Sequence, residues 1–184
     1  MSSKDFHLRS PAALTTLTAD TNTPRLTPPQ SPIKWNHTAE FIKSKTDEEI
    51  SANRKVLDTV ANLPRDDCNF QSVFETIAKA NHGFMVETSP LIFYTHVTPD
   101  DAVRAASIAA EETLDRYSVE VEMRVDVYES LINAQKNIKK DSISLTPEQQ
   151  RLVDKMILDG KRAGLHLEEK ERDKLKTVCW PNYP

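Results

Sequence analysis

The chain has 184 residues, and its 24 Lys and Arg against 28 Asp and Glu give a net charge of −4. This mild acidity argues against binding to nucleic acid or to an anionic membrane, because both need clustered positive charge. The three glycines are too far apart to form a phosphate loop or a dinucleotide fingerprint. No apolar run approaches the roughly 18 residues that a bilayer span needs. Composition and motif chemistry alone therefore leave the function open.

The first 32 residues have the composition of a tail. Ten of them are Ser or Thr and five are Pro, with only scattered apolar side chains. Such a segment cannot bury enough apolar surface to offset the entropy of ordering. We expect residues 1–32 to be disordered, and the absence of an apolar core after a basic start argues against a secretory signal.

The remainder is predicted to be helical. Two sites combine a capping Thr, a Pro at the first helical position and an acid or amide at the third: Thr98-Pro99-Asp100-Asp101 and Thr146-Pro147-Glu148-Gln149. Gly164 suits a left-handed helix end, with Leu165 packing back on the last turn. We predict helices at residues 37–62, 69–89, 99–138, 147–163 and 167–179.

The second of these helices carries an apolar stripe that ends near a proline. Apolar residues from Phe70 to Met85 recur at spacings of three and four. Pro90 has no backbone N–H to donate, so we expect the helix to end or kink there. The residues Leu91–Tyr94 would then add one further apolar turn.

The third segment admits two interpretations. Between Val119 and Val127 apolar and charged residues alternate, which is typical of a strand. However, no Gly or Pro bounds the run, no second strand-like run could pair with it, and acid-to-base pairs such as Glu120 and Arg124 fall four residues apart. We therefore predict one very long helix over 99–138, within an all-α antiparallel bundle.

No constellation in the sequence predicts catalysis. None of the five histidines has a second histidine four positions later, and Cys68 and Cys179 lack neighbouring ligands. We expect His82 at the core or its boundary, His96 in solvent, and His166 near free carbonyls at a helix end. The acidic pairs Asp66/Asp67, Glu111/Glu112 and Glu168/Glu169 have the look of surface charge. We predict no catalytic, cofactor-binding or metal-binding residue in this chain.

Several segments together resemble one family of enzymes. They are Trp35-Asn36, Arg104–Ser107, Val119–Tyr128, Leu145–Glu148 and Gly160–Leu167. In this order they are similar to the N-terminal region of the thimet oligopeptidase, neurolysin and saccharolysin family of zinc metallopeptidases. The resemblance covers residues 33–178 without a large gap.

The resemblance implies a helical fold and a family activity. Members are two-lobed helical enzymes that cleave short peptides in a channel, with one zinc ion held by an H-E-x-x-H motif and a further Glu. No position in this sequence matches those ligands, so none is transferred here. The resemblance thus implies a non-catalytic portion of a metalloendopeptidase, inactive as it stands, in the cytoplasm, with mitochondria left open.

The family pattern breaks off near the end of the chain. The helix that should continue after Lys174 meets Val178-Cys179-Trp180-Pro181 instead, which suggests a copy truncated before the catalytic region. We expect three parts: the tail 1–32, a helical domain 33–178 and an irregular end 179–184. Two alternatives are a helical module that binds peptides or another protein on the former channel wall, or self-associates, and a fragment of a longer active peptidase.

Overall fold

The computed structural model describes residues 34–172 and 174, and these residues are helical without any β-strand. The predicted all-α class is thereby confirmed. The predicted tail 1–32 and the irregular end 179–184 lie outside the described residues. The described elements are α1 (Ala39–Ala61), a 3₁₀ turn η1 (Arg65–Asp67), a π-helical segment η2 (Phe70–Glu75) that runs directly into α2 (Thr76–Val97), α3 (Asp101–Glu122), α4 (Val125–Lys140) and α5 (Pro147–Arg162).

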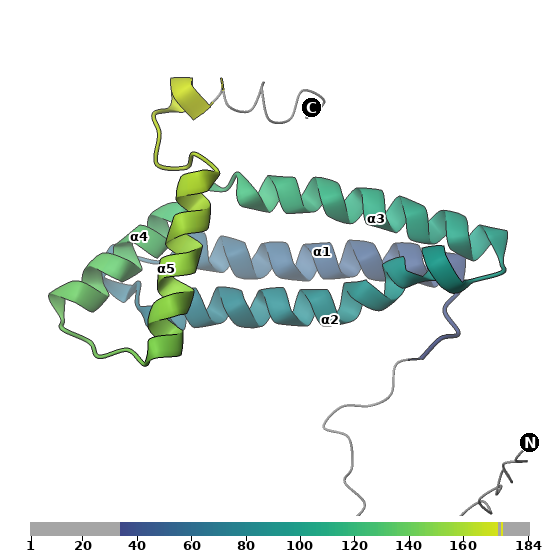
Figure 1. Cartoon of the computed structure of the whole chain (residues 1–184), viewed down its shortest axis with the longest axis horizontal. Coiled ribbons are helices and arrows are strands. Elements are labelled where there is room, and N and C mark those ends of the chain that lie inside the picture. The colour runs from purple at the N-terminus through teal and green to yellow at the C-terminus, as the bar shows by residue number, and fades with distance from the viewer. Residues whose placement is uncertain (1–33, 173, 175–184) are drawn as a thin grey trace, which may run out of the picture. The chain divides into compact units, whose positions relative to one another are not determined.

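Helices α1, α2 and α3 pack side by side, each running antiparallel to the next along the chain (Figure 1). Near the start of α1 they share a small core of four buried side chains: Ile42, Leu91, Tyr94 and Ala110. Ala110 is the contribution of α3 to this core, and its small side chain is buried there.

The second and larger core lies where α4 and α5 join the bundle, with α5 crossing the other helices steeply in Figure 1. Its most completely buried large side chains come from α1, η2 and α5: Leu57, Phe74 and Val153. None of the helices among the described residues is long and apolar enough to cross a membrane.

The single long helix predicted over 99–138 is wrong, because the chain breaks at Met123 and Arg124. Arg124 has extended backbone angles (φ −76°, ψ 95°) and precedes the first turn of α4. Its guanidinium donates to Asp58 on α1 and to Asp126 on α4, instead of to Glu120 along one helix. Glu120 pairs with Arg54 of α1. Partners on other elements thus favour a bend that the four-residue spacing of charges did not predict.

The second predicted helix does not end at Pro90, because α2 continues to Val97. Leu91 and Tyr94, one turn beyond the proline, are buried in the smaller core, and their burial offsets the hydrogen bond lost at Pro90. The hydroxyl of Ser107 on α3 accepts from the Thr95 N–H at 3.0 Å and donates to the Leu91 carbonyl at 2.8 Å. A side chain placed in the helical ladder bends a helix, and α2 changes direction in this half (Figure 1).

Local capping signals are mostly confirmed. Thr146 and Gln149 form the predicted capping box at the start of α5. At its other end Gly164 has a φ of 76°, and the Leu165 N–H donates to the Gly160 carbonyl, which completes the predicted left-handed helix end. At α3 the cap is two residues later than predicted: Asp100, not Thr98, accepts from the Ala102 N–H.

Candidate functional site

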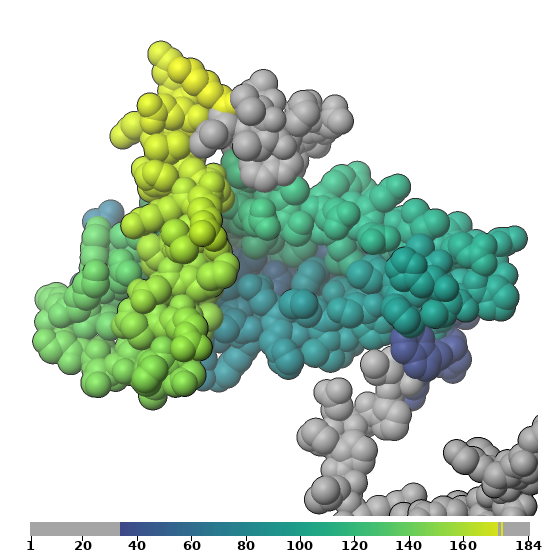
Figure 2. Space-filling view, in the orientation of Figure 1, coloured from purple at the N-terminus to yellow at the C-terminus, as the bar shows by residue number. Residues whose placement is uncertain are grey.

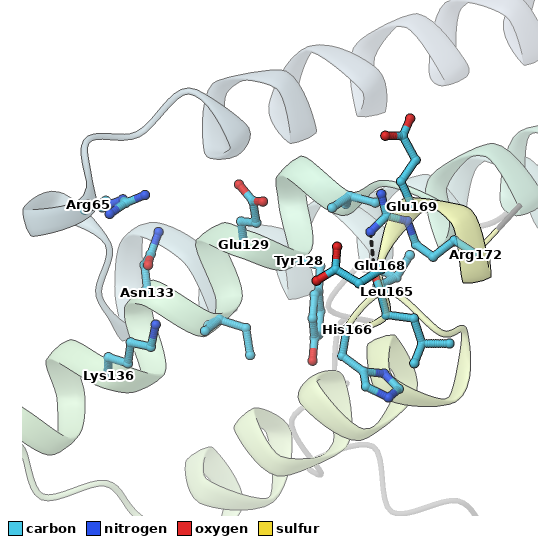
Figure 3. A pocket seen from close by; sticks show the side chains of 13 residues that line it. Arg65, Tyr128, Glu129, Asn133, Lys136, Leu165, His166, Glu168, Glu169 and Arg172 are labelled. Carbon is cyan, nitrogen blue, oxygen red and sulfur yellow. Dashed lines mark hydrogen bonds between the residues drawn. The ribbon is translucent and has the colours of Figure 1, made fainter.

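A cavity of about 490 Å³ lies between α4 and the turn that follows α5 (Figure 3). Arg65, Glu129 and Lys136 line one side of it, and Glu168, after the turn, and Arg172, in the short helical stretch 169–172, line the other. The turn is ordered by the Gly164 helix end and by Arg172, whose Nη1 donates to the Leu167 carbonyl at 2.7 Å. Acids and bases alternate around the cavity, so it has no excess of one sign that would select an ion.

The chemistry of this cavity favours binding over catalysis. Its aromatic wall is Tyr128, and burial raises the pKa of that phenol above its ordinary value. His166, the only histidine on the lining, is exposed, and no nucleophile is hydrogen-bonded to it. A general base needs a positioned partner within hydrogen-bond reach, and the lining of this cavity provides none.

A larger groove of about 620 Å³ runs along α5, and residues of α1, α2, α3 and α4 complete its lining. Its floor is apolar, with Leu57, Ile77 and Met156 among its lining residues. Charged side chains stand at its edge, where Lys155 pairs with Asp159. The groove therefore combines an apolar floor with a charged edge.

The strongest polar network holds α1 against α3 and has a structural role. The Tyr117 hydroxyl donates to Asn53 Oδ1 at 2.8 Å inside the bundle, and burial raises the pKa of the phenol. Arg54 lies over the Tyr117 ring at 5.2 Å and makes two hydrogen bonds to Glu120. Each charged group is matched within the network, so none is left to bind a substrate.

Across residues 34–172 and 174, no three His, Cys, Asp or Glu side chains meet in an arrangement that could hold a metal ion. His96 is exposed, as predicted, whereas His82 is exposed on α2 and not at the core. At the end of α5, Arg172 and not His166 donates to the turn carbonyl. Cys68 is a buried free thiol whose pKa is raised by burial, and Cys179 lies outside the described residues.

Of the three predicted acidic pairs, only Glu111 is half-buried, and the other five side chains are exposed. Asp66 and Asp67 are exposed, as are Glu168 and Glu169 and the second member of the pair Glu111/Glu112. They are therefore surface charge, as expected. What sequence reasoning missed is the groove along α5, because its lining comes from five helices that only the packed structure brings together.

These features define an all-helical unit with a cavity and a groove, and without three grouped metal-ligand side chains among its described residues. No family model matches the chain. Among curated proteins, it is 30% identical over 148 residues to the thimet-like oligopeptidase of Dictyostelium discoideum, covering 79% of this chain and 22% of the relative. It is 25% identical over 150 residues to saccharolysin of Saccharomyces cerevisiae, covering 82% of this chain and 21% of that protein. A probable thimet oligopeptidase of Arabidopsis thaliana matches at 25% identity over 143 residues, covering 78% of this chain and 20% of the relative.

The chain is homologous to thimet oligopeptidase and saccharolysin over about four fifths of its own length. It spans about a fifth of the length of the curated relatives that it matches. The resemblance seen in the sequence is thereby confirmed.

Proposed function

We propose that this chain is a non-catalytic helical part of an oligopeptidase of the zinc metallopeptidase type. One observation carries the proposal: the homology to two oligopeptidases covers most of the helical unit yet only about a fifth of each relative. A metallopeptidase needs a metal with an open coordination position and an activated water. Most of the described acids are instead exposed or engaged in ion pairs with Arg and Lys, as Glu49, Glu120 and Asp58 are.

The role that the geometry supports is that of a scaffold. The packed core of α1, α2 and α3 gives a rigid wall, and the groove along α5 offers an apolar floor on which a peptide could lie. A rigid wall that binds and orients a peptide contributes to hydrolysis through positioning, without itself touching the reacting atoms.

A peptide-cleavage assay tests the inactive state directly. The purified 184-residue chain is incubated with a quenched fluorescent peptide and Zn²⁺, with the Dictyostelium relative as the positive control. We expect no turnover by this chain. Turnover that a chelator abolishes would show that the chain holds a working metal site and would contradict the proposal.

A second candidate function is a stand-alone module that binds peptides or another protein. The apolar floor of the groove along α5 favours it. Fluorescence anisotropy with labelled peptides tests whether the 184-residue chain binds a peptide without the rest of an oligopeptidase. Saturable binding that is lost in Met156→Lys but kept in Lys139→Glu, which lies away from the groove lining, would support a binding module.

A further inference from the structure

Helix α2 carries large apolar side chains on its exposed face as well as on its buried face, which is unusual for a helix at a protein surface. One face is buried against the rest of the unit and includes Ile77, Thr88, Leu91 and Tyr94. Beyond the exposed Lys79 in its first turn, the opposite face is exposed from His82 to Val97 and consists of His82, Met85, Val86, Ser89, Phe93, His96 and Val97. We call these seven residues the outer face of α2.

The outer face has the properties of an interface. Met85 is 64% exposed, Phe93 46% and Val97 52%. None of its seven residues is Lys, Arg, Asp or Glu, whereas the solvent face of an ordinary surface helix is charged. The ring of Trp35, 51% exposed, lies 5.6 Å from the ring of Phe93 and extends the apolar surface beyond the helix.

The spacing along the outer face suits another helix. Met85, Ser89, Phe93 and Val97 follow one another at intervals of four residues and so form one ridge. The small Ser89 in the middle of this ridge allows a close approach. In Figure 2 part of the surface of α2 is open beside α5, with no described helix over it.

We propose that the outer face of α2 is the docking surface for the catalytic part of an oligopeptidase, contacted by an amphipathic helix of that part. This inference rests on the proposed function. The relatives continue for roughly four fifths of their length outside the region that this chain matches. A helix from that further length of polypeptide would cover the outer face of α2. Helices α1 and α3 cannot do so, because they pack on the other side of α2.

Cysteine accessibility tests the proposal. Met85→Cys and Phe93→Cys are made singly in a Cys179→Ser background, where Cys68 is buried. Lys139→Cys, at the exposed end of α4, is the control. Each is labelled with a maleimide in the 184-residue chain and in a chimera, in which residues 34–172 replace the matching region of the Dictyostelium relative. We expect both face positions to react as fast as the control in the chain, and at least about tenfold more slowly in the chimera.

Equal labelling of the face in the chain and in a folded chimera would overturn the proposal. Protection in the 184-residue chain that grows with its concentration would show that a second copy covers the face and would also overturn it. If the chimera does not fold, the same cysteines are placed at the aligned positions of the intact Dictyostelium relative. Protection there supports the proposal, and free labelling contradicts it.

The chimera separates this inference from the proposed function. A chimera that cleaves peptide while its outer face labels freely would contradict the docking surface alone. A chimera whose face is protected but which cleaves no peptide, although the relative does, would contradict the scaffold role alone.

Discussion

Arg124 is the residue at which the bundle turns from α3 into α4. Its side chain is 15% exposed, and its guanidinium donates to Asp58 and Asp126, whose side chains are about half exposed. Because both carboxylates keep part of their hydration, we expect Arg124→Gln to lower the free energy of unfolding by about 1–2 kcal/mol near neutral pH. Urea unfolding measures this change. Lys155→Gln, which breaks only an exposed pair within one helix, should cost less than about 0.5 kcal/mol.

The contribution of Arg124 should also depend on pH. Its hydrogen bonds lower the pKa of the Asp126 carboxyl below the ordinary value. The carboxyl therefore binds its proton more weakly in the folded than in the unfolded chain, so the stabilisation is present above the ordinary pKa and is lost as the pH falls through the folded pKa. The stability difference between the native chain and Arg124→Gln should shrink below about pH 4. A difference that stays constant from neutral pH to about pH 2 would contradict this account.

Two glycines inside helices predict opposite results for the same substitution. A Cβ at Gly160 would overlap the ring of the buried Tyr128, whereas a Cβ at Gly83 meets no atom within 4 Å. We expect Gly160→Ala to destabilise the chain by about 1–3 kcal/mol, because a packed ring must move. Gly83→Ala should stabilise it by up to about 1 kcal/mol through helix propensity. Thermal unfolding followed by circular dichroism compares them, and equal effects of the two variants would rule out the close approach of α5 to α4.

At the scale of the helix, Pro90 destabilises α2, and the burial of Leu91 and Tyr94 beyond it offsets this loss. An alanine at this position restores a backbone N–H and removes the clash of the proline ring with the preceding turn. We expect Pro90→Ala to raise the free energy of unfolding by about 1–3 kcal/mol. Pro64→Ala, in the loop after α1, should instead be neutral or slightly destabilising. Its main effect is to raise the conformational entropy of the unfolded chain. A loss of stability in Pro90→Ala would mean that the bend itself is needed for packing.

Ser107 is the side chain through which α3 holds the distal half of α2. Its hydroxyl is fully buried, accepts from the Thr95 N–H, and has one proton to donate to the carbonyl of Leu91 at 2.8 Å or of Ile92 at 2.9 Å. We expect Ser107→Ala to lower the free energy of unfolding by about 1–3 kcal/mol, since buried polar groups lose their partner. Ser118→Ala, an exposed serine on the same helix, is the control and should change it by less than about 0.5 kcal/mol. Similar values for the two serines would disprove the bridging role.

At the scale of the whole molecule, local signals in the sequence predicted local structure. The capping box at Thr146 and the helix end at Gly164 depend only on neighbours in the chain, and both are confirmed. The break at Arg124 could not be predicted in the same way, because its partner Asp58 is 66 positions away. Met85 belongs to the predicted apolar stripe and yet is exposed, since periodicity does not say which apolar face the rest of a fold covers.

The candidate site shows the same limit. The absence of paired histidines was visible in the sequence, but the cavity beside Glu168 and the groove along α5 form only when the turn after α5 is folded against α4. The relation to two oligopeptidases comes from sequence similarity and could not be inferred from the packing of the helices.

Zinc stoichiometry tests the central claim most directly. The 184-residue chain is dialysed against Zn²⁺, freed of unbound metal, and measured by atomic emission beside the Dictyostelium relative. Our account predicts far less than one zinc ion per chain. Retention of one zinc ion per chain, abolished when His82 or His166 is replaced by Ala, would contradict it.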